Sequence, residues 1–357
     1  MKPRLPVRNA ILQRRTYEAP AEGRQNKLRL DFNENTSGSS PAVLRALAKS
    51  TPSQLALYPE YLAPSRRLAK YFSVRPEELL LTNGGDDALR VFFDAFVESG
   101  RSILICEPTF PMYRYYAEIY GARIDELHYD PGMNFPLDAC LRALKRKPAV
   151  FFLANPNNPT GTLLPKPAIE KILRAASHTA VVIDEAYAEF SGLTVIPWVR
   201  HFPQLFVART FSKAAGLAAL RLGAVIAGAD SVAILRRAMP PFPVNIAALV
   251  AAEAALHEGI TMRRYIQETK RLREWFAKEL HKLDIRTFPS AGNFLLADFG
   301  EPGPAIFQNL GKKGILLRER SGIGAGYVRI TIGSAAQMKT VLEAIRKLLR
   351  KNQPAAV

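Results

Sequence analysis

Hydrophobic and polar positions along the chain alternate between two kinds of segment. Short apolar runs, typical of buried strands, are separated by longer stretches in which apolar residues recur with the period of a helix. The predicted strands of the first part are residues 79–82, 102–105, 149–153, 180–183, 205–208 and 223–227, and residues 86–99 and 166–177 are predicted helices. Such alternation is typical of a mostly parallel sheet covered on both faces. The predicted fold class is therefore α/β.

The last third of the chain has a different pattern. Residues 246–283 read as one long helical segment, with Trp275 and Phe276 on the inner face. Strands are predicted at residues 293–299, 315–318 and 327–332, followed by a helix over residues 335–350 with Ser334 as its cap. We expect an N-terminal arm (1–40) that joins the small domain, a large domain (41–245) and a smaller α+β domain (246–357).

Composition is that of a globular protein with a strongly basic balance. Of the 357 residues, 48% are hydrophobic and 23% charged, and the net charge is +17. This composition excludes a disordered chain. The basic residues are scattered, and no helix-turn-helix, zinc-finger or aromatic RNA-binding pattern accompanies them, so we expect no nucleic-acid partner. A positive field favours encounters with small anions.

Membrane, secretory and metal-binding classes find no support. No apolar run approaches the roughly 20 residues of a membrane span, and the N-terminus lacks the apolar segment of a secretory signal. We therefore expect a cytoplasmic protein. Cys106 and Cys140 form no CxxC pair, and the five histidines show no ligand spacing, so neither a disulfide framework nor a metal site is expected.

A lysine, a carboxylate and several anion-binding groups occur in a suggestive order. Asp184 ends a predicted strand, and Thr210-Phe211-Ser212-Lys213 is followed by Arg221. A lysine amine can hold the aldehyde of pyridoxal phosphate as a Schiff base, and a carboxylate can keep the ring nitrogen protonated. Two hydroxyls and a guanidinium suit the phosphate. A Ser-Lys pair alone is more often a solvated turn, but the ordered combination predicts a pyridoxal phosphate site.

Two further features fit this cofactor. Gly84, Gly85 and Asp86 lie where a predicted strand turns into a helix, so their N–H groups and the helix dipole can face a phosphate. A plain glycine-rich turn is the alternative. Asp184 follows the apolar residues 181–183, where an unpaired carboxylate would be costly to bury. A pyridinium N–H is its natural partner, and an N-cap or an ion pair at the strand end is the alternative.

Several motifs occur along the chain in an order that resembles a known protein family. They are Asn33-Glu34-Asn35, Leu57-Tyr58-Pro59-Glu60, Pro156-Asn157-Asn158-Pro159-Thr160-Gly161, Asp184-Glu185-Ala186-Tyr187, Phe211-Ser212-Lys213-Ala214 and Val328-Arg329-Ile330-Thr331. From about Tyr17 to the last helix the chain resembles the fold-type-I, class I/II aminotransferases, most closely the histidinol-phosphate aminotransferases. The resemblance implies a pyridoxal-phosphate-dependent transferase fold and a homodimer with shared active sites.

The resemblance also implies roles around the cofactor. Lys213, Asp184 and Tyr187 would be catalytic, and Tyr187 and Asn158 would hydrogen-bond the ring's phenolic oxygen. Phe110 resembles the aromatic residue that stacks on the ring; many members have tyrosine there, so a hydroxyl is lost. Tyr58 would reach the cofactor phosphate of the partner subunit. The alternatives are a Pro-Asn turn for Asn158 and core aromatic positions for Phe110 and Tyr58.

Substrate residues follow from the same resemblance. Arg329 would grip the anionic group of the substrate, Arg318 and Tyr17 would support it, and Asn293 would face the substrate. The implied reaction converts histidinol phosphate and 2-oxoglutarate into imidazole acetol phosphate and glutamate. An ion pair with Glu319 is the alternative for Arg318.

Other activities remain open at this point. The nearest alternative is an aromatic or broad-specificity aminotransferase. A threonine-phosphate decarboxylase would usually start with a His-Gly-Gly motif, whereas the first histidine here is His128. A non-catalytic cofactor-binding or nucleic-acid-binding protein is a further alternative, and only the net charge supports it.

Two segments depart from the family's commonest form. Thr36-Ser37-Gly38 stands in place of a proline followed by an aromatic residue. In Gly85-Asp86-Asp87 the last residue is an aspartate, where a glutamate is more usual. The first departure lies in the arm near the substrate, so it bears on substrate specificity more than on the chemistry.

Overall fold

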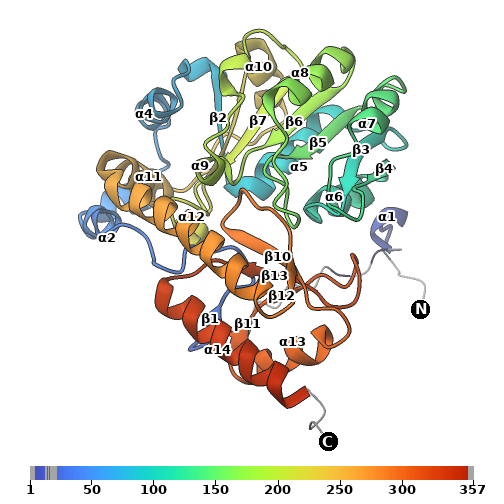
Figure 1. Cartoon of the computed structure of the whole chain (residues 1–357). Helices are drawn as coiled ribbons and strands as arrows, with labels where there is room; N and C mark the ends of the chain where they lie inside the picture. The colour runs from blue at the N-terminus through green and yellow to red at the C-terminus, as the bar shows by residue number, and fades with distance from the viewer. Residues whose placement is uncertain (1–4, 13, 15, 17–21, 353–357) are drawn as a thin grey trace, which may run out of the picture.

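The chain folds into two packed units joined by a long helix, as Figure 1 shows for the computed structural model. The structure describes residues 5–12, 14, 16 and 22–352. The N-terminal segment includes the short helix α1 (Asn9–Leu12). No helix in these described ranges is long and apolar enough to cross a membrane.

The larger unit is built on a seven-stranded sheet with the order β2-β8-β7-β6-β5-β3-β4. Its strands are β2 (Leu79–Thr82), β3 (Ser102–Glu107), β4 (Arg123–His128), β5 (Val150–Ala154), β6 (Ala180–Asp184), β7 (Leu205–Thr210) and β8 (Gly223–Ala227). Only β8 runs antiparallel to its neighbours. The predicted mostly parallel α/β sheet is therefore confirmed. The edge strand β4 was not predicted, because its polar, half-exposed sequence contains no apolar run.

Successive strand residues supply two separate hydrophobic cores. Phe152 and Val182 pack on one face of the sheet, whereas Phe151 and Val181 pack on the other. Burial on both faces explains why these strands are almost wholly apolar. The first face is covered by α5 (Gly84–Phe96), α6 (Met112–Tyr120) and α10 (Ala229–Arg237), and the second by α7 (Leu137–Leu144) and α8 (Lys166–Ala175).

Shorter helices surround this sheet. They are α2 (Pro41–Ala48), α3 (Pro52–Ala56), α4 (Leu62–Phe72), α9 (Ala188–Ser191) and the 3-10 turns η1 (Pro76–Glu78), η2 (Ile196–Trp198) and η3 (Ala218–Leu220). Ser40 caps α2 by accepting a hydrogen bond from Ala42 N.

The predicted single long helix over residues 246–283 is wrong, because two helices occupy this range. They are α11 (Ile246–Glu258) and α12 (Ile260–His281), and Gly259 separates them with a φ of +56°. A positive φ ends an α-helix, and glycine adopts it without steric cost. The buried alanines of α11 belong to the core of the large sheet, whereas α12 runs on toward the smaller unit with Phe276 fully buried.

The smaller unit has a four-stranded antiparallel sheet with the order β12-β13-β10-β9. Its elements are β9 (Arg286–Thr287), β10 (Phe294–Asp298), α13 (Gly303–Lys312), β12 (Arg318–Glu319), β13 (Tyr327–Thr331) and α14 (Ala335–Asn352). Ser334 caps α14, since its hydroxyl accepts a hydrogen bond from Gln337 N. The predicted single strand 315–318 is wrong, because β11 (Ile315–Leu316) and β12 belong to different sheets.

The N-terminal arm is attached to the smaller unit by backbone pairing. Strand β1 (Leu28–Arg29) runs parallel to β11, and Thr331 N donates to Leu30 O over 3.0 Å. This pairing carries residues 31–35 to the junction of the two units. It supports our proposal of an arm, a large domain and a small domain divided near residues 40 and 245, with α11 packed on the large core.

Candidate active site

A cavity of about 540 Å³ lies where the carboxyl ends of the parallel strands face the arm and the smaller unit. Open α/β sheets bind ligands at this edge, since loops from several strands meet there. Most of the predicted site residues line the cavity, although they are far apart in the sequence. They are Gly85, Asp86, Phe110, Asn158, Asp184, Tyr187, Thr210, Ser212, Lys213, Arg221, Arg318 and Arg329.

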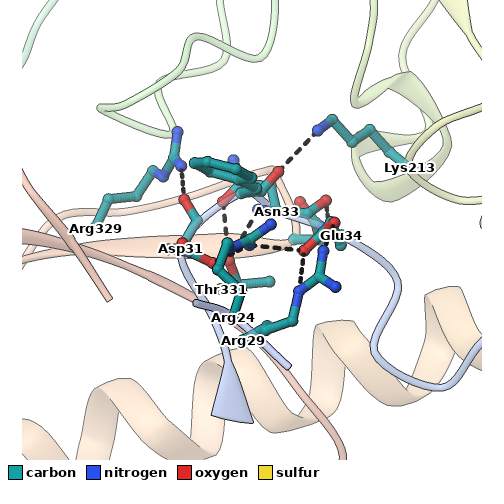
Figure 2. A network of polar contacts seen from close by, with 10 residues as sticks. Arg24, Arg29, Asp31, Asn33, Glu34, Lys213, Arg329 and Thr331 are labelled. Carbon is teal, nitrogen blue, oxygen red and sulfur yellow. Dashed lines mark hydrogen bonds and ion pairs between the residues drawn. The ribbon is translucent and has the colours of Figure 1, made fainter. Parts of the chain in front are cut away.

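The Lys213 amine points across the cavity toward the arm, as Figure 2 shows. Its Nζ donates a hydrogen bond to the carbonyl oxygen of Phe32 over 2.9 Å. Burial, and then the positive charge of Arg329, lower the pKa of the amine from its usual 10.5 to about 8. A lysine whose neutral form is accessible near neutral pH can act as a nucleophile and as a general base.

Asp184 lies at the end of β6 with its carboxylate held by two donors. Tyr113 donates its hydroxyl to Oδ2 over 2.7 Å, and Ala186 N donates to Oδ1 over 3.1 Å. Burial raises the pKa of Asp184, whereas these two hydrogen bonds oppose the rise. A carboxylate oriented in this way can accept a further N–H from a ligand in the cavity.

Donor groups gather at the start of α5. Gly84 has a φ of +81°, and a Cβ added there would lie 2.6 Å from Nη2 of Arg221. The same Nη2 pairs with Oδ2 of Asp86 over 3.1 Å. On the adjoining strand end, the Thr210 hydroxyl accepts a hydrogen bond from Ser212 N over 3.1 Å. A helix N-terminus, two hydroxyls and a guanidinium together can bind a phosphate.

Arginine and amide groups define the opposite end of the cavity. The Oδ1 atom of Asn158 accepts hydrogen bonds from Arg329 Nη1 and, over 3.3 Å, from Arg320 Nη2. Arg329 also donates to the carbonyl oxygen of Asp31, as Figure 2 shows. The hydroxyl of Tyr187 accepts a hydrogen bond from Asn33 Nδ2 over 2.9 Å.

Of the four remaining predicted residues, three are described by the structure and do not line the cavity. Gly84 lies just behind it, against Arg221. Tyr58 has 77% of its surface exposed and stacks on Phe242, which excludes the core position as its role in this chain. Asn293 is fully buried and donates to the carbonyl oxygen of Asn33 over 3.1 Å. Tyr17 lies outside the described residues. The roles of all four stay predictions.

Sequence reasoning missed several residues that line or support the cavity. They are Arg29, Phe32, Glu34, Tyr113, Arg209 and Arg320. Arg320 could have been found from its spacing, because it follows Arg318 by two residues and extended backbone places such side chains on one face. Tyr113 gave no such signal, since a tyrosine on an amphipathic helix reads as an ordinary core residue.

The donor set fits pyridoxal phosphate. An amine with a lowered pKa, a buried carboxylate and a cluster of phosphate donors all open onto one cavity. Lys213 would hold the aldehyde carbon, Asp184 the ring nitrogen, and Thr210, Ser212, Arg221 and the start of α5 the phosphate. Phe110 lines the same cavity and offers an aromatic face to the ring.

Comparisons with known proteins agree with this chemistry. The family described as aminotransferase class I and II matches residues 25–345. Histidinol-phosphate aminotransferase of Geobacillus sp. (strain WCH70) is 36% identical, with 91% of each chain covered. Histidinol-phosphate aminotransferase 1 of Carboxydothermus hydrogenoformans is 35% identical, with 98% of this chain and 99% of the relative covered.

Solved structures show the same fold. Histidinol-phosphate aminotransferase from Sinorhizobium meliloti, solved in complex with pyridoxal-5'-phosphate, has a TM-score of 0.85 at 24% identity and covers 91% of this chain and 92% of its own. L-threonine-O-3-phosphate decarboxylase from Porphyromonas gingivalis has a TM-score of 0.79 at 25% identity, and the match covers 90% of this chain and 99% of the decarboxylase chain. Together these matches show that the chain belongs to the pyridoxal-phosphate-dependent class I and II aminotransferase family.

Proposed function

We propose that the protein is a homodimeric enzyme that transfers the amino group of histidinol phosphate to 2-oxoglutarate. The charge of the cavity is the main evidence for the class of substrate. Seven basic and three acidic side chains line it within the described residues. Such an excess favours anionic substrates. The names of the relatives support histidinol phosphate in particular, and histidine biosynthesis makes the cytoplasm the proposed setting.

Pyridoxal phosphate, when bound, withdraws electrons from the substrate Cα and so weakens its bonds. The chain supplies the proton transfers and the orientation. Lys213 Nζ, with a pKa of about 8, is suited to take the Cα proton as a base and to return it as an acid. Asp184 Oδ2 and Oδ1 are fixed by Tyr113 and Ala186, so the carboxylate can hold the proton of a ring N–H.

Arg318 and Arg329 are the proposed anion clamp. Their Cα atoms are direct partners in the antiparallel register of β12 and β13, and both side chains line the cavity. Planar guanidiniums bind carboxylate or phosphate in a bidentate manner, so one site can serve both substrates in turn. An apolar amino acid would gain less from this arrangement, which disfavours the aromatic aminotransferase alternative.

Exposed apolar side chains in the chain segments on either side of Tyr58, and Phe242 stacked on it, support the proposed dimer. The exposed group consists of Leu44, Leu55, Leu57, Tyr58, Leu62 and Phe242, from α2 to the start of α4 and the segment before α11. Clustered exposed apolar residues mark interaction surfaces in soluble proteins. A second copy on this surface would bury Tyr58 and could bring its hydroxyl to the partner's cofactor phosphate.

The test is a substrate panel with the purified holoenzyme. We expect kcat/KM for histidinol phosphate to exceed that for phenylalanine and tyrosine. Arg329→Ala should cost roughly 2 to 5 kcal/mol in transition-state stabilisation for every anionic substrate, because a desolvated anion loses one partner. Arg318→Ala should slow histidinol phosphate more than glutamate.

Two results would contradict the proposal and favour another function. Preference of the wild type for phenylalanine, or an equal effect of Arg318→Ala on all substrates, would favour an aromatic aminotransferase. Release of carbon dioxide from O-phosphothreonine, with no amino transfer from histidinol phosphate, would favour the decarboxylase instead.

A further inference from the structure

Three arginines lie on one face of the small sheet. Arg318 and Arg329 are direct partners in the register. Arg320 follows Arg318 by two residues, and its N donates to Tyr327 O over 2.8 Å, which extends the antiparallel ladder beyond β12. Side chains two residues apart in extended backbone point to the same face. All three arginines accordingly line the cavity.

Arg320 and Arg329 converge on a single acceptor. Both donate to Oδ1 of Asn158, and Arg329 is 6% exposed. Two guanidiniums beside one neutral amide oxygen contribute positive potential to this end of the cavity, and the potential is stronger where little water screens it. The arrangement therefore favours an anionic occupant next to Asn158.

Arg320 also occupies the border of the cavity. Arg318 and Arg320 line both the cavity and a neighbouring cleft of about 900 Å³ between the two units. A substrate group that extends from Lys213 toward this cleft would pass beside Arg320.

We infer that Arg320 is a third anion-binding arginine that determines specificity for a phosphorylated amino donor; this inference rests on the proposed function. A phosphate dianion has three acceptor oxygens and can take hydrogen bonds from three guanidiniums. A carboxylate has only two oxygens, which Arg318 and Arg329 can satisfy. Arg320 therefore contributes to binding of the phosphate and little to binding of glutamate.

Arg320→Gln in the holoenzyme tests this inference with two readouts. The first is KM and kcat for histidinol phosphate and for glutamate. We expect KM for histidinol phosphate to rise roughly 10- to 100-fold, the value of one hydrogen bond to a charged group. The kcat should stay within about twofold, because the contact is equal in ground and transition states. Glutamate should be unaffected, and Arg320→Lys should restore part of the loss.

The second readout is competitive inhibition by inorganic phosphate, measured with glutamate as the amino donor. Arg320→Gln should weaken it by a similar factor. Arg264→Gln is the matched control, since it removes the same charge from an exposed position on α12 and should change nothing. Unchanged phosphate inhibition, or equal losses for both donors, would overturn the inference. If the wild type fails to use histidinol phosphate, the proposed function falls, while phosphate inhibition still decides the role of Arg320.

Discussion

Gly84 tests how the backbone at the start of α5 places Arg221. Alanine at this position meets two obstacles. The φ of +81° disfavours any L side chain, and the new Cβ would lie 2.6 Å from Nη2 of Arg221. The guanidinium would have to retreat by about 0.8 Å to reach an ordinary contact of 3.4 Å. Gly84→Ala should therefore weaken binding of the cofactor phosphate.

The two effects have different sizes and different readouts. The backbone conformation should cost roughly 1 to 2 kcal/mol in the free energy of unfolding. Displacing Arg221 should change stability little, because its ion pair with Asp86 is partly exposed and such pairs contribute about 1 kcal/mol at most. Losing one charge-assisted hydrogen bond to the phosphate should cost about 1.5 to 3 kcal/mol, which corresponds to a roughly 10- to 150-fold higher Kd for pyridoxal phosphate.

The assay compares Gly84→Ala with Gly100→Ala. Gly100 has the same φ of +81°, but apart from its two chain neighbours no residue described by the structure has a heavy atom within 4 Å of its Cβ position. Urea unfolding of the apoprotein should show similar destabilisation for both variants. Titration with pyridoxal phosphate should show weakened binding for Gly84→Ala alone. If both variants bind the cofactor equally well, the proposed steric link between Gly84 and Arg221 is refuted.

Three further predictions concern acid stability, the lysine and the dimer. A hydrogen bond from Arg200 is the main cause that lowers the pKa of Glu78 from 4.5 to about 2. The ionised Glu78 therefore stabilises the folded protein fully above pH 4.5, and this stabilisation is lost as the pH falls toward 2. Glu78→Gln should cost about 1 to 3 kcal/mol at pH 7 and flatten the pH dependence of urea unfolding in that window. In the apoprotein, labelling of Lys213 by an amine reagent should rise through pH 8, and Arg329→Met should move this midpoint upward by removing a positive charge; an unmoved midpoint would contradict the electrostatic explanation. Mixing Lys213→Ala with Tyr58→Ala should restore activity through hybrid dimers, and no recovery despite demonstrated subunit exchange would count against Tyr58 acting in the partner's site.

Much of the large unit could be predicted from the chain because its strands are buried on both faces. Burial of this kind leaves a continuous apolar run such as Val181-Val182-Ile183. Strand β4 leaves no such run, because it lies at the edge and is half-exposed. The break at Gly259 was missed since the residues on both sides keep a helical pattern, and only the positive φ reveals the end of α11.

The candidate site shows the same division between local and distant signals. Ser212-Lys213 and Asp184 stand in short motifs whose chemistry is readable residue by residue. By contrast, the contact of Tyr113 with Asp184 and the convergence of Arg320 on Asn158 join residues separated by 71 and 162 positions. Such contacts depend on how α6 and the two units pack, which no local pattern encodes.

Borohydride treatment of the holoenzyme tests most directly whether Lys213 carries the cofactor. Reduction makes the bond between a lysine Nζ and pyridoxal phosphate permanent, so peptide mass mapping can locate it. We predict one modified peptide containing Lys213, and its absence from Lys213→Ala. A cofactor-loaded wild type with no adduct at Lys213, or with the adduct on another lysine, would contradict the assignment of the active site.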